Sequence, residues 1–321
     1  MEKKIIIVSG DPNSINSELI YKCWKKISKS LKHQIILISN FQLLKKQFKK
    51  LNYPVSMIQV KNINDVGKTN KLKILNINLN FKKPFEVKDK SASEFIIKSL
   101  NTAHKLGLND DVKGIINCAI NKNLLKKERS GVTEYLALKC NVPKDSEVMF
   151  ITNGVLSVVP ITTHIDLRDV AKKIQKRLIV RKIKSLDKFF KDLFKRKPKI
   201  GLLGLNPHNA EFRKDSEEMK FIIPSVKKLR KNGIKIKGPL ISDITFVKDY
   251  NNYDVIVGMY HDQVLSPFKS IFKFDAINLT LGLKYLRVSP DHGTATNLIG
   301  KRKANPMSLI RCVEFINKFG K

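Results

Sequence analysis

Apolar runs of the kind found in buried strands alternate along this chain with segments whose apolar residues recur at helical spacing. The first run, residues 4–9, leads into an amphipathic stretch around residues 19–31. The same succession continues through QIILIS, LLKKQFKKL, KILNINL, SEFIIKSLNTAHKLG and GIINCAI. Strands that alternate with helices in this way predict a layered α/β fold with a mostly parallel sheet.

Two later segments also have helical character. Within residues 216–232 the apolar positions follow the helical period, and Gly233 follows as a stop signal. We expect this helix to cover the sheet with one buried stripe, formed by Met219, Ile222, Ile223, Val226 and Leu229. The lysine-rich stretch 182–199 predicts an exposed helix and turn.

Three of the six histidines each stand just beyond a strand-like apolar run. They are His164 after VVPITT, His208 after GLLGLNP and His261 after VIVGMY. Open α/β sheets bind ligands beyond the carboxyl ends of their strands. Imidazole is a common neutral ligand of divalent ions, and three of them leave coordination positions open for a substrate. Any one of these histidines is equally well explained by a hydrogen bond to the backbone, but together they predict a metal site.

The charge is strongly basic, because 62 Lys and Arg stand against 28 Asp and Glu and give a net charge of +34. A nucleic-acid-binding protein is therefore one class to consider. The lysines, however, interrupt nearly every element opposite its apolar positions, and no RNP motif, zinc-finger spacing or helix-turn-helix stands out. We expect solvated helix faces and no specific nucleic-acid partner, with a charge that helps to attract an anionic substrate.

The chain shows no sign of a membrane or secreted protein. No apolar run approaches the roughly 20 residues that a membrane span needs, and MEKKIIIVSGDP moves straight into a strand rather than a signal peptide. Four widely spaced cysteines without a CxxC pair indicate buried thiols in a reducing compartment: Cys23, Cys118, Cys140 and Cys312. A soluble cytoplasmic protein is expected.

Glycine motifs argue against one kind of cofactor site and leave another open. Gly10 after the first strand is followed by DPNSINSE, so the GxGxxG fingerprint of a standard dinucleotide-binding site is absent. The polar, glycine-containing segment 289–306, SPDHGTATNLIGKRKANP, follows the strand-like NLTLG. On spacing alone it is either an ordinary connection or a cofactor loop.

Several segments together resemble the 4-hydroxythreonine-4-phosphate dehydrogenase family of vitamin B6 synthesis: GLNPH, IIPSVKKLRKNGIKIKGPLISD, MYHDQ, INLTLGLKYLRVSPDHGTA and THIDLRDV. The likeness is dense from about Gly114 onward and faint before it. It implies the fold of the isocitrate and isopropylmalate dehydrogenases, with two α/β/α lobes and a cleft between them. Residues 1–140 with 285–321 would form the first lobe and residues 141–284 the second. The resemblance also implies a homodimer whose site is completed across the interface.

The resemblance further implies roles for single residues. In the family, three histidines bind a divalent ion (Zn, Mg or Co), which carries over to His164, His208 and His261. The segment that grips NAD or NADP suggests His292, Gly293, Thr294 and Asn305. The positions that hold the phosphorylated substrate correspond to Thr133, Lys269, Asn278 and Arg287, residue types that suit phosphate oxygens. Candidates for proton transfer are Asp243 and Lys122.

The implied reaction is oxidation and decarboxylation of 4-phosphooxy-L-threonine to 3-amino-2-oxopropyl phosphate. The chain departs from the family where Gly-His-Thr-Glu is usual, because it has Val132 before Thr133. After NPH it also has the short, charged NAEFRKDSEE instead of a longer glycine-rich loop.

These departures keep a second hypothesis open, a dehydrogenase of the same fold for another phosphorylated four-carbon acid such as threonate or erythronate 4-phosphate. A third hypothesis is a non-enzymatic, basic nucleic-acid-binding protein that has kept the fold. The three histidines argue against it.

Overall fold

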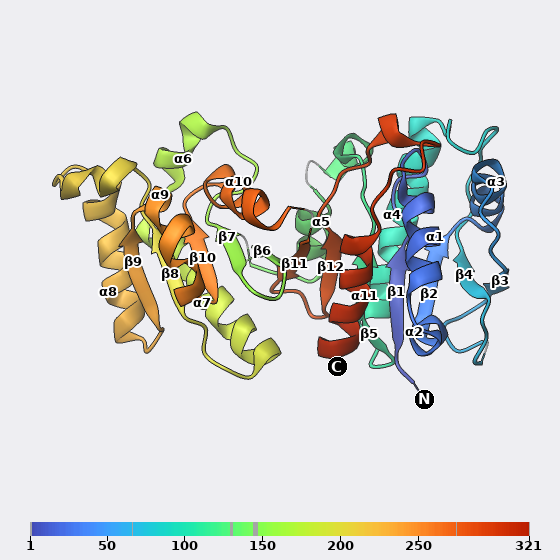
Figure 1. Cartoon of the computed structure of the whole chain (residues 1–321), viewed down its shortest axis with the longest axis horizontal. Coiled ribbons are helices and arrows are strands. Elements are labelled where there is room, and N and C mark those ends of the chain that lie inside the picture. The colour runs from blue at the N-terminus through green and yellow to red at the C-terminus, as the bar shows by residue number, and fades with distance from the viewer. Residues whose placement is uncertain (1, 66, 129–130, 144–146, 274, 321) are drawn as a thin grey trace. The chain divides into compact units, whose positions relative to one another are not determined.

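The computed structural model describes residues 2–65, 67–128, 131–143, 147–273 and 275–320. The chain divides into two compact units, the first formed by Met1–Cys140 with Leu283–Lys321 and the second by Asn141–Gly282. In each unit helices flank the strands (Figure 1). The α/β class predicted from the alternating pattern is therefore confirmed.

The sheet of the first unit has six parallel strands in the order β3-β4-β2-β1-β5-β12. Its strands are β1 (Lys4–Val8), β2 (Ile35–Ser39), β3 (Met57–Val60), β4 (Leu72–Asn76), β5 (Val112–Asn117) and β12 (Arg287–Pro290). Its helices are α1 (Asn16–Lys26), α2 (Lys29–Gln34), α3 (Phe41–Leu51), α4 (Asp89–Gly107), η1 (Lys122–Glu128), α5 (Val132–Lys139), η6 (Thr296–Leu298) and α11 (Met307–Phe319).

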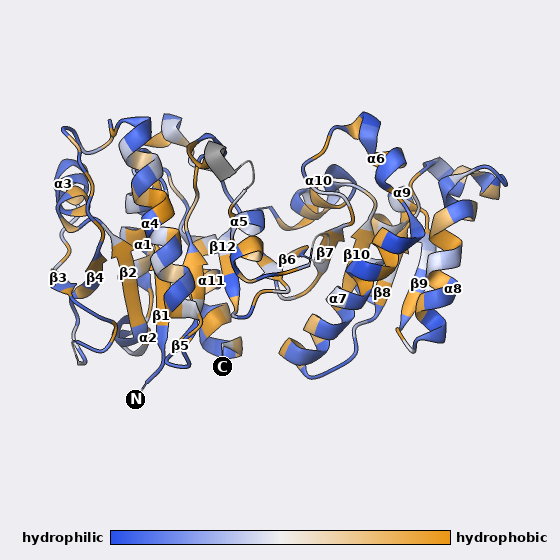
Figure 2. Ribbon diagram, turned by 180° about the vertical axis from the view of Figure 1, so that it is seen from behind, coloured by the Kyte–Doolittle hydropathy of each residue, from blue (hydrophilic) through white to orange (hydrophobic). Residues whose placement is uncertain are grey.

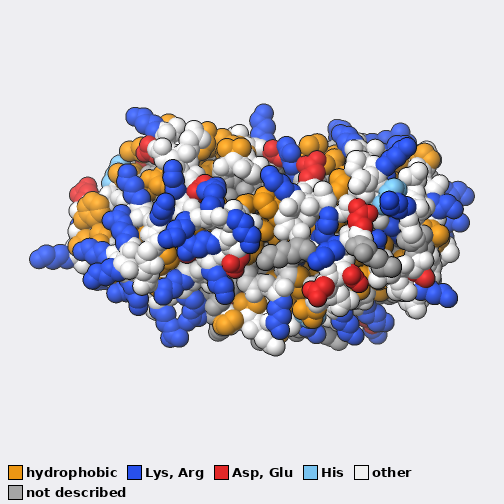
Figure 3. Space-filling model, turned by 90° about the horizontal axis from the view of Figure 1, so that it is seen from below, with side chains coloured by type: hydrophobic (Ala, Val, Ile, Leu, Met, Phe, Trp, Pro, Cys, Tyr) orange, Lys and Arg blue, Asp and Glu red, His pale blue; other side chains and the backbone are white. Residues whose placement is uncertain are grey.

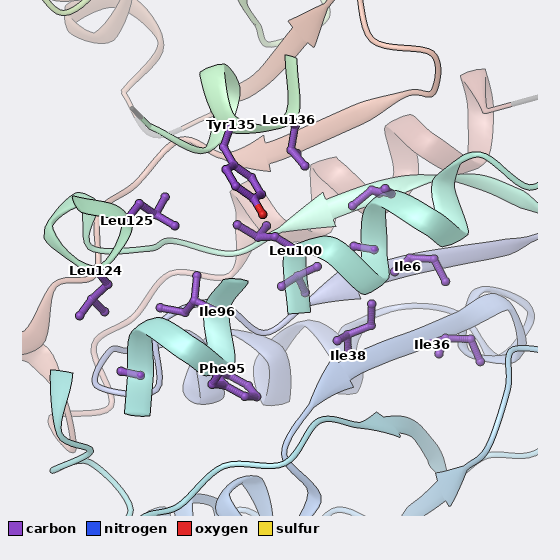
Figure 4. Packing of buried hydrophobic residues seen from close by; sticks show 14 of the residues in the cluster. Ile6, Ile36, Ile38, Phe95, Ile96, Leu100, Leu124, Leu125, Tyr135 and Leu136 are labelled. Atoms are coloured by element: carbon purple, nitrogen blue, oxygen red, sulfur yellow. The ribbon is translucent and has the colours of Figure 1, made fainter. Parts of the chain in front are cut away.

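Helices cover both faces of this sheet. Successive strand residues point to opposite faces, so neighbouring residues in a strand are buried against different helices. Ile6 and Ile38 belong to the cluster that packs against α4 (Figure 4), whereas Ile7 and Leu37 lie beside Trp24 of α1. The central positions of β1 and β2 are all apolar for this reason, and these two strands appear as hydrophobic bands in Figure 2. The α4 side of the cluster includes Phe95, Ile96 and Leu100, which Figure 4 labels.

The second unit has a mixed sheet in the order β11-β6-β7-β10-β8-β9. Strands β7, β10, β8 and β9 are parallel neighbours, while β6 runs antiparallel to both β7 and β11. The strands are β6 (Val148–Thr152), β7 (Ser157–Pro160), β8 (Ile200–Leu203), β9 (Ile236–Leu240), β10 (Val255–Gly258) and β11 (Ile277–Leu281). The helices are α6 (Leu167–Lys173), α7 (Lys176–Phe194), η2 (Pro207–Phe212), η3 (Glu218–Ile222), α8 (Ile223–Lys231), α9 (Ser242–Ile244), η4 (Thr245–Asp249), η5 (Tyr250–Asn252) and α10 (His261–Phe272).

Two helical predictions need correction. The segment 216–232 is helical and ends before Gly233, but it begins with the π-helical turn η3, which shifts the register by one residue. Glu218 is therefore buried and Met219 is 37% exposed, so Met219 is not part of the core stripe. The lysine-rich stretch is also not exposed on all sides, because Lys182 of α7 is buried and donates a hydrogen bond to the backbone oxygen of Glu147 at 2.8 Å.

The surface agrees with the interpretation of the charge as solvated faces. Lys and Arg side chains are scattered over the face drawn in Figure 3, with few acidic residues between them. All four cysteines are buried and free, as their apolar surroundings predict. Among the described residues, no helix has both the length and the apolar character needed to cross a membrane.

The α4 cluster yields a first prediction. Leu100 is fully buried in it, so Leu100→Ala should lower the free energy of unfolding by about 2–5 kcal/mol through lost apolar contact and a cavity. Urea denaturation measures this change. Leu138→Ala, at a position that is 69% exposed, is the matched control and should be close to wild type; an equal loss in both variants would contradict the assignment of the core.

Candidate functional site

Two of the three predicted histidines lie side by side in the second unit. His164 follows β7 and His261 begins α10 directly after β10, the parallel neighbour of β7. Their ring centroids are 5.7 Å apart and their planes meet at 42°. Nδ1 of His261 lies 2.9 Å from Oδ1 of Asp262, which fits a protonated Nδ1 and leaves Nε2 with its lone pair. An imidazole nitrogen oriented in this way by a carboxylate is typical of a metal ligand.

A cavity of about 330 Å³ opens beside this pair. Thr162 lines this cavity, and its side chain links the segments that follow β7 and β10. Its Oγ1 donates a hydrogen bond to the backbone oxygen of Met259 at 2.7 Å. The lining mixes polar groups with apolar residues that lead into α6: Thr162, Thr163, His164, Ile165, Leu167, Val170, Tyr260, His261 and Asp262. A small polar ligand with an apolar part suits this lining.

The third histidine, His208, stands exposed on the turn η2 after β8. Its φ is 49°, and the four residues that follow it also have positive φ, without a glycine among them. Such backbone costs roughly 1–2 kcal/mol per residue for side chains other than glycine. In the part of the chain that the structure describes, no three His, Cys, Asp or Glu residues are grouped so as to hold a metal ion. The structure thus brings His164 and His261 together but does not add His208 to them.

Buried Glu218 holds the start of the turn that carries His208. Its Oε1 accepts hydrogen bonds from the backbone nitrogens of Leu205 and Asn206, both at 2.8 Å, and its Oε2 accepts one from Nδ2 of Asn206 at 3.0 Å. Burial alone raises the pKa of this carboxyl group, but the hydrogen bonds outweigh burial and hold the pKa below its usual value. Glu218 could not be recognised from the sequence, since the helical period places Met219 rather than Glu218 toward the core.

Arg287, the first residue of β12, is a buried charge in the first unit. Its Nε donates to Oδ1 of Asn117 at 2.6 Å, and its Nη1 donates to Oγ1 of Thr133 at 3.2 Å. Burial lowers the pKa of the guanidinium group to about 10, so it remains positive at neutral pH. The structure brings together the predicted Arg287 and Thr133. Asn117, at the end of the apolar run GIINCAI, is a residue that sequence reasoning missed.

The other two predicted phosphate ligands belong to the second unit. Lys269 is exposed on α10, and Asn278 lies on β11. Oδ1 of Asn278 is buried and has no hydrogen-bond partner among the described residues. An unsatisfied buried acceptor of this kind calls for a donor beyond the described residues.

The predicted cofactor loop has one feature that suits a ligand. Nδ1 of His292 lies 2.9 Å from the backbone oxygen of Gly293, while its Nε2 is buried and has no partner among the described residues. Burial lowers the pKa of His292, so the ring is neutral and its Nε2 can accept a hydrogen bond. A side chain at Gly293 would meet nothing within 4 Å, which means that the backbone there is open to approach.

The remaining residues of this loop have structural contacts. The backbone oxygen of Thr294 accepts from the nitrogen of Ile15 at 3.2 Å, and Oδ1 of Asn305 accepts from the nitrogen of Met307 at 3.0 Å, at the start of α11. Buried Glu18 of α1 accepts from the nitrogen of Ala304 at 3.0 Å. The loop is therefore fastened to α1 and α11 at several points.

The two candidates for proton transfer are both on the surface. Asp243 follows β9, and its Oδ1 accepts a hydrogen bond from the adjacent nitrogen of Ile244 at 3.0 Å. Lys122 begins η1 after β5, in the first unit. Asp243 shares its sheet edge with the histidines, because β9, β8, β10 and β7 are parallel and end there.

Comparison with known families shows where the chain belongs. The sequence model described as pyridoxal phosphate biosynthetic protein PdxA matches residues 30–316, most of the chain. The chain belongs to the PdxA family. The resemblance seen in its motifs is therefore confirmed.

Relatives of known name agree with this assignment. The 4-hydroxythreonine-4-phosphate dehydrogenase of a Sulfurihydrogenibium species is 37% identical over 317 residues, which cover 97% of this chain and 96% of the relative. The crystal structure of the 4-hydroxythreonine-4-phosphate dehydrogenase of Klebsiella pneumoniae superposes with a TM-score of 0.87 at 26% identity, covering 99% of this chain and 100% of that one. The prediction of a dehydrogenase is confirmed.

The wider fold relationship is also confirmed. Isocitrate dehydrogenase from Methylococcus capsulatus matches with a TM-score of 0.50 at 12% identity over 98% of this chain and 84% of its own, a likeness of fold alone. Val132 is the first residue of α5 and packs against the hydrophobic cluster that includes the α4 residues Phe95, Ile96 and Leu100. An apolar side chain thus stands next to Thr133, which contacts Arg287.

The buried carboxylate of this PdxA family member yields a second prediction. The pKa of Glu218 is lower in the folded protein than its ordinary value of 4.5. Its contribution to stability is therefore complete above that ordinary value and is lost as the pH falls through the folded-state pKa. Glu218→Gln should lower the free energy of unfolding at pH 7 by about 1–3 kcal/mol, since buried donors lose a charged acceptor.

The difference between wild type and Glu218→Gln should shrink as the pH falls below about 4. Urea denaturation across this pH range measures it. Glu86→Gln, at an exposed carboxylate paired with Lys83, serves as the control with little effect at any pH. A Glu218 effect that is constant with pH would contradict the charged role.

Proposed function

We propose that this chain oxidises and decarboxylates 4-phosphooxy-L-threonine to 3-amino-2-oxopropyl phosphate in pyridoxal 5'-phosphate synthesis, using NAD or NADP and a divalent ion. The observation that carries the proposal is the pairing of His164 with His261 beside a cavity at the carboxyl ends of parallel strands. The names of the relatives support the same reaction.

The residues of the pair fit a divalent ion. Two imidazoles with centroids 5.7 Å apart, one of them held by a carboxylate, form a donor set that suits Zn²⁺ or Co²⁺ better than Mg²⁺. We assign His164 and His261 as ligands and His208 as the predicted third, contributed by the turn η2. When bound, such an ion supplies a Lewis acid beside the hydroxyl group that is oxidised.

The nicotinamide cofactor fits the loop in the first unit. The neutral Nε2 of His292 offers a buried acceptor without a partner, and Gly293 leaves its backbone open. We assign His292, Gly293 and Thr294 to cofactor binding, while the contact of Asn305 with Met307 also gives Asn305 a capping role. When bound there, a nicotinamide cofactor would supply the hydride acceptor of the reaction.

The chain's own charges suit the phosphate end of the substrate. Arg287 is fixed by Asn117 and Thr133, so its guanidinium group keeps a set orientation. Lys269 and Asn278 stay predicted phosphate ligands, because an ammonium group and an amide nitrogen can both donate hydrogen bonds to phosphate oxygens. We assign Asp243 or Lys122 as the base that removes the proton of the hydroxyl group during its oxidation.

The proposed reaction has two steps, an oxidation followed by a decarboxylation. Oxidation of the secondary alcohol would transfer a hydride to bound NAD or NADP and a proton to a base, and would give a ketone β to the carboxylate. The bond between the α-carbon and the carboxylate carbon would then break and release carbon dioxide. The electron pair of that bond would remain on the substrate as an enolate, which is protonated to the product. The net charge of +34 favours the approach of an anionic substrate to the protein.

The proposal predicts the behaviour of histidine variants. Purified protein with 4-phosphooxy-L-threonine, NAD or NADP and added Zn²⁺, Mg²⁺ or Co²⁺ should form reduced cofactor, followed by its absorbance. His164→Ala should lower kcat/KM by roughly 100-fold or more, since a metal ion contributes several kcal/mol to such reactions. His208→Ala should weaken metal binding measured by calorimetry.

His33→Ala is the matched control, because His33 lies on α2 in the first unit, and it should keep wild-type turnover. Full turnover by His164→Ala would sink the proposal. Wild-type metal affinity in His208→Ala would remove only the third ligand from it.

Val132 favours a second candidate, a dehydrogenase for threonate or erythronate 4-phosphate. An apolar residue stands where the family usually offers an imidazole, beside Thr133. The main proposal predicts the highest kcat/KM with 4-phosphooxy-L-threonine, and Val132→His should not reverse that order. A higher kcat/KM with either acid lacking the amino group would establish the second candidate instead.

A further inference from the structure

The side chain of Gln263 on α10 joins three loops at the functional edge of the second unit. Its Nε2 donates to the backbone oxygen of Gly204 at 2.7 Å and to Oγ of Ser242 at 2.9 Å. Its Oε1 accepts from the backbone nitrogen of Met259 at 2.6 Å. One amide group therefore connects the segments that follow β8, β9 and β10.

The surrounding backbone is shaped to admit this side chain. A Cβ atom at Gly258 would lie 2.9 Å from Oε1 of Gln263 and 2.5 Å from Cγ1 of Val264. At Gly204 a Cβ atom would lie 2.0 Å from Oδ1 of Asn209, in the turn that carries His208. Two glycines thus allow the loops to approach one another closely.

Each of the three joined loops carries a predicted functional group. His208 follows Gly204 along the chain, Asp243 is the neighbour of Ser242, and His261 lies between Met259 and Gln263. The loop of His164 is tied to the same point, because Oγ1 of Thr162 donates to the backbone oxygen of Met259. The positions of these groups therefore depend on a shared set of hydrogen bonds.

The fold of α10 does not depend on Gln263. Val264, Leu265 and Phe268 are buried in the core of the second unit and anchor the helix by apolar contact. Loss of the amide contacts would leave this packing in place and release the loops from one another.

We propose that Gln263 is a positioning residue that sets the spacing of the loops bearing His208, Asp243 and His261, and thereby the affinity of the histidine set for a divalent ion. The inference rests on the proposed function. Residues that orient metal ligands typically change metal affinity by about 10–100-fold when they are replaced.

The test compares Gln263→Met and Gln263→Glu with the wild-type protein. Methionine keeps the length of the side chain and removes its hydrogen bonds, whereas glutamate keeps the acceptor for Met259 and sets a carboxylate oxygen against the oxygen of Gly204. Titration with Co²⁺, followed by calorimetry and visible absorption, should show a Kd raised about 10–100-fold in both variants.

Ser225→Ala is the matched control for stability. Ser225 is buried in α8 of the same unit and donates to the backbone oxygen of Phe221 at 2.6 Å, away from the three loops. It should lower Tm as much as the Gln263 variants do while leaving the Co²⁺ affinity unchanged. Wild-type Co²⁺ affinity in both Gln263 variants would overturn the inference.

A second readout separates this inference from the proposed function. If the wild-type protein binds no Co²⁺, the metal part of the proposed function fails. The ring proton and nitrogen chemical shifts of the histidines then decide on Gln263. Shifts of His208 and His261 that move in Gln263→Met, with those of His33 and His104 constant, support positioning, and unchanged shifts throughout overturn it.

Discussion

The parallel pairing of β7 with β10 is the constraint on which the candidate site depends. Pro160 and Gly258 are direct partners in the register, so strands β7 and β10 end at the same level of the sheet. His164 and His261 follow within a few residues and meet beside one cavity. A shift of one residue in this register would turn each side chain to the other face. The apolar core beneath, with Val158 and Ile256 on neighbouring strands, fixes the register by burial.

The features that depend on local pattern could be predicted from the sequence. Apolar runs and helical periods identify the strands and helices, and polar residues just beyond the strands point to the functional edge. The contacts that organise this edge could not be predicted, because they join distant parts of the chain. Arg287 meets Asn117 across 170 positions, and Gln263 reaches Gly204 across 59. Local irregularity was the other obstacle, since the π-helical turn η3 exchanges the places of Glu218 and Met219.

Basic residues serve two different purposes in this chain. Most lysines lie on solvated faces, where each ion pair contributes little. Lys83 with Glu86 is an example, with both side chains largely exposed. Arg287 is the opposite case, because its burial is matched by oriented acceptors and its charge persists despite a lowered pKa. A net charge of +34 therefore says little about the site, whereas the surroundings of one arginine say much.

The fixed guanidinium of Arg287 has a consequence for the thermodynamics of binding. A long side chain that is free in solution loses up to about 2 kcal/mol of rotamer freedom when it is ordered. Asn117 and Thr133 already order Arg287 while the protein folds. For the phosphate binding proposed for Arg287, the side chain would already be ordered, and binding would not require the entropic cost of ordering it a second time.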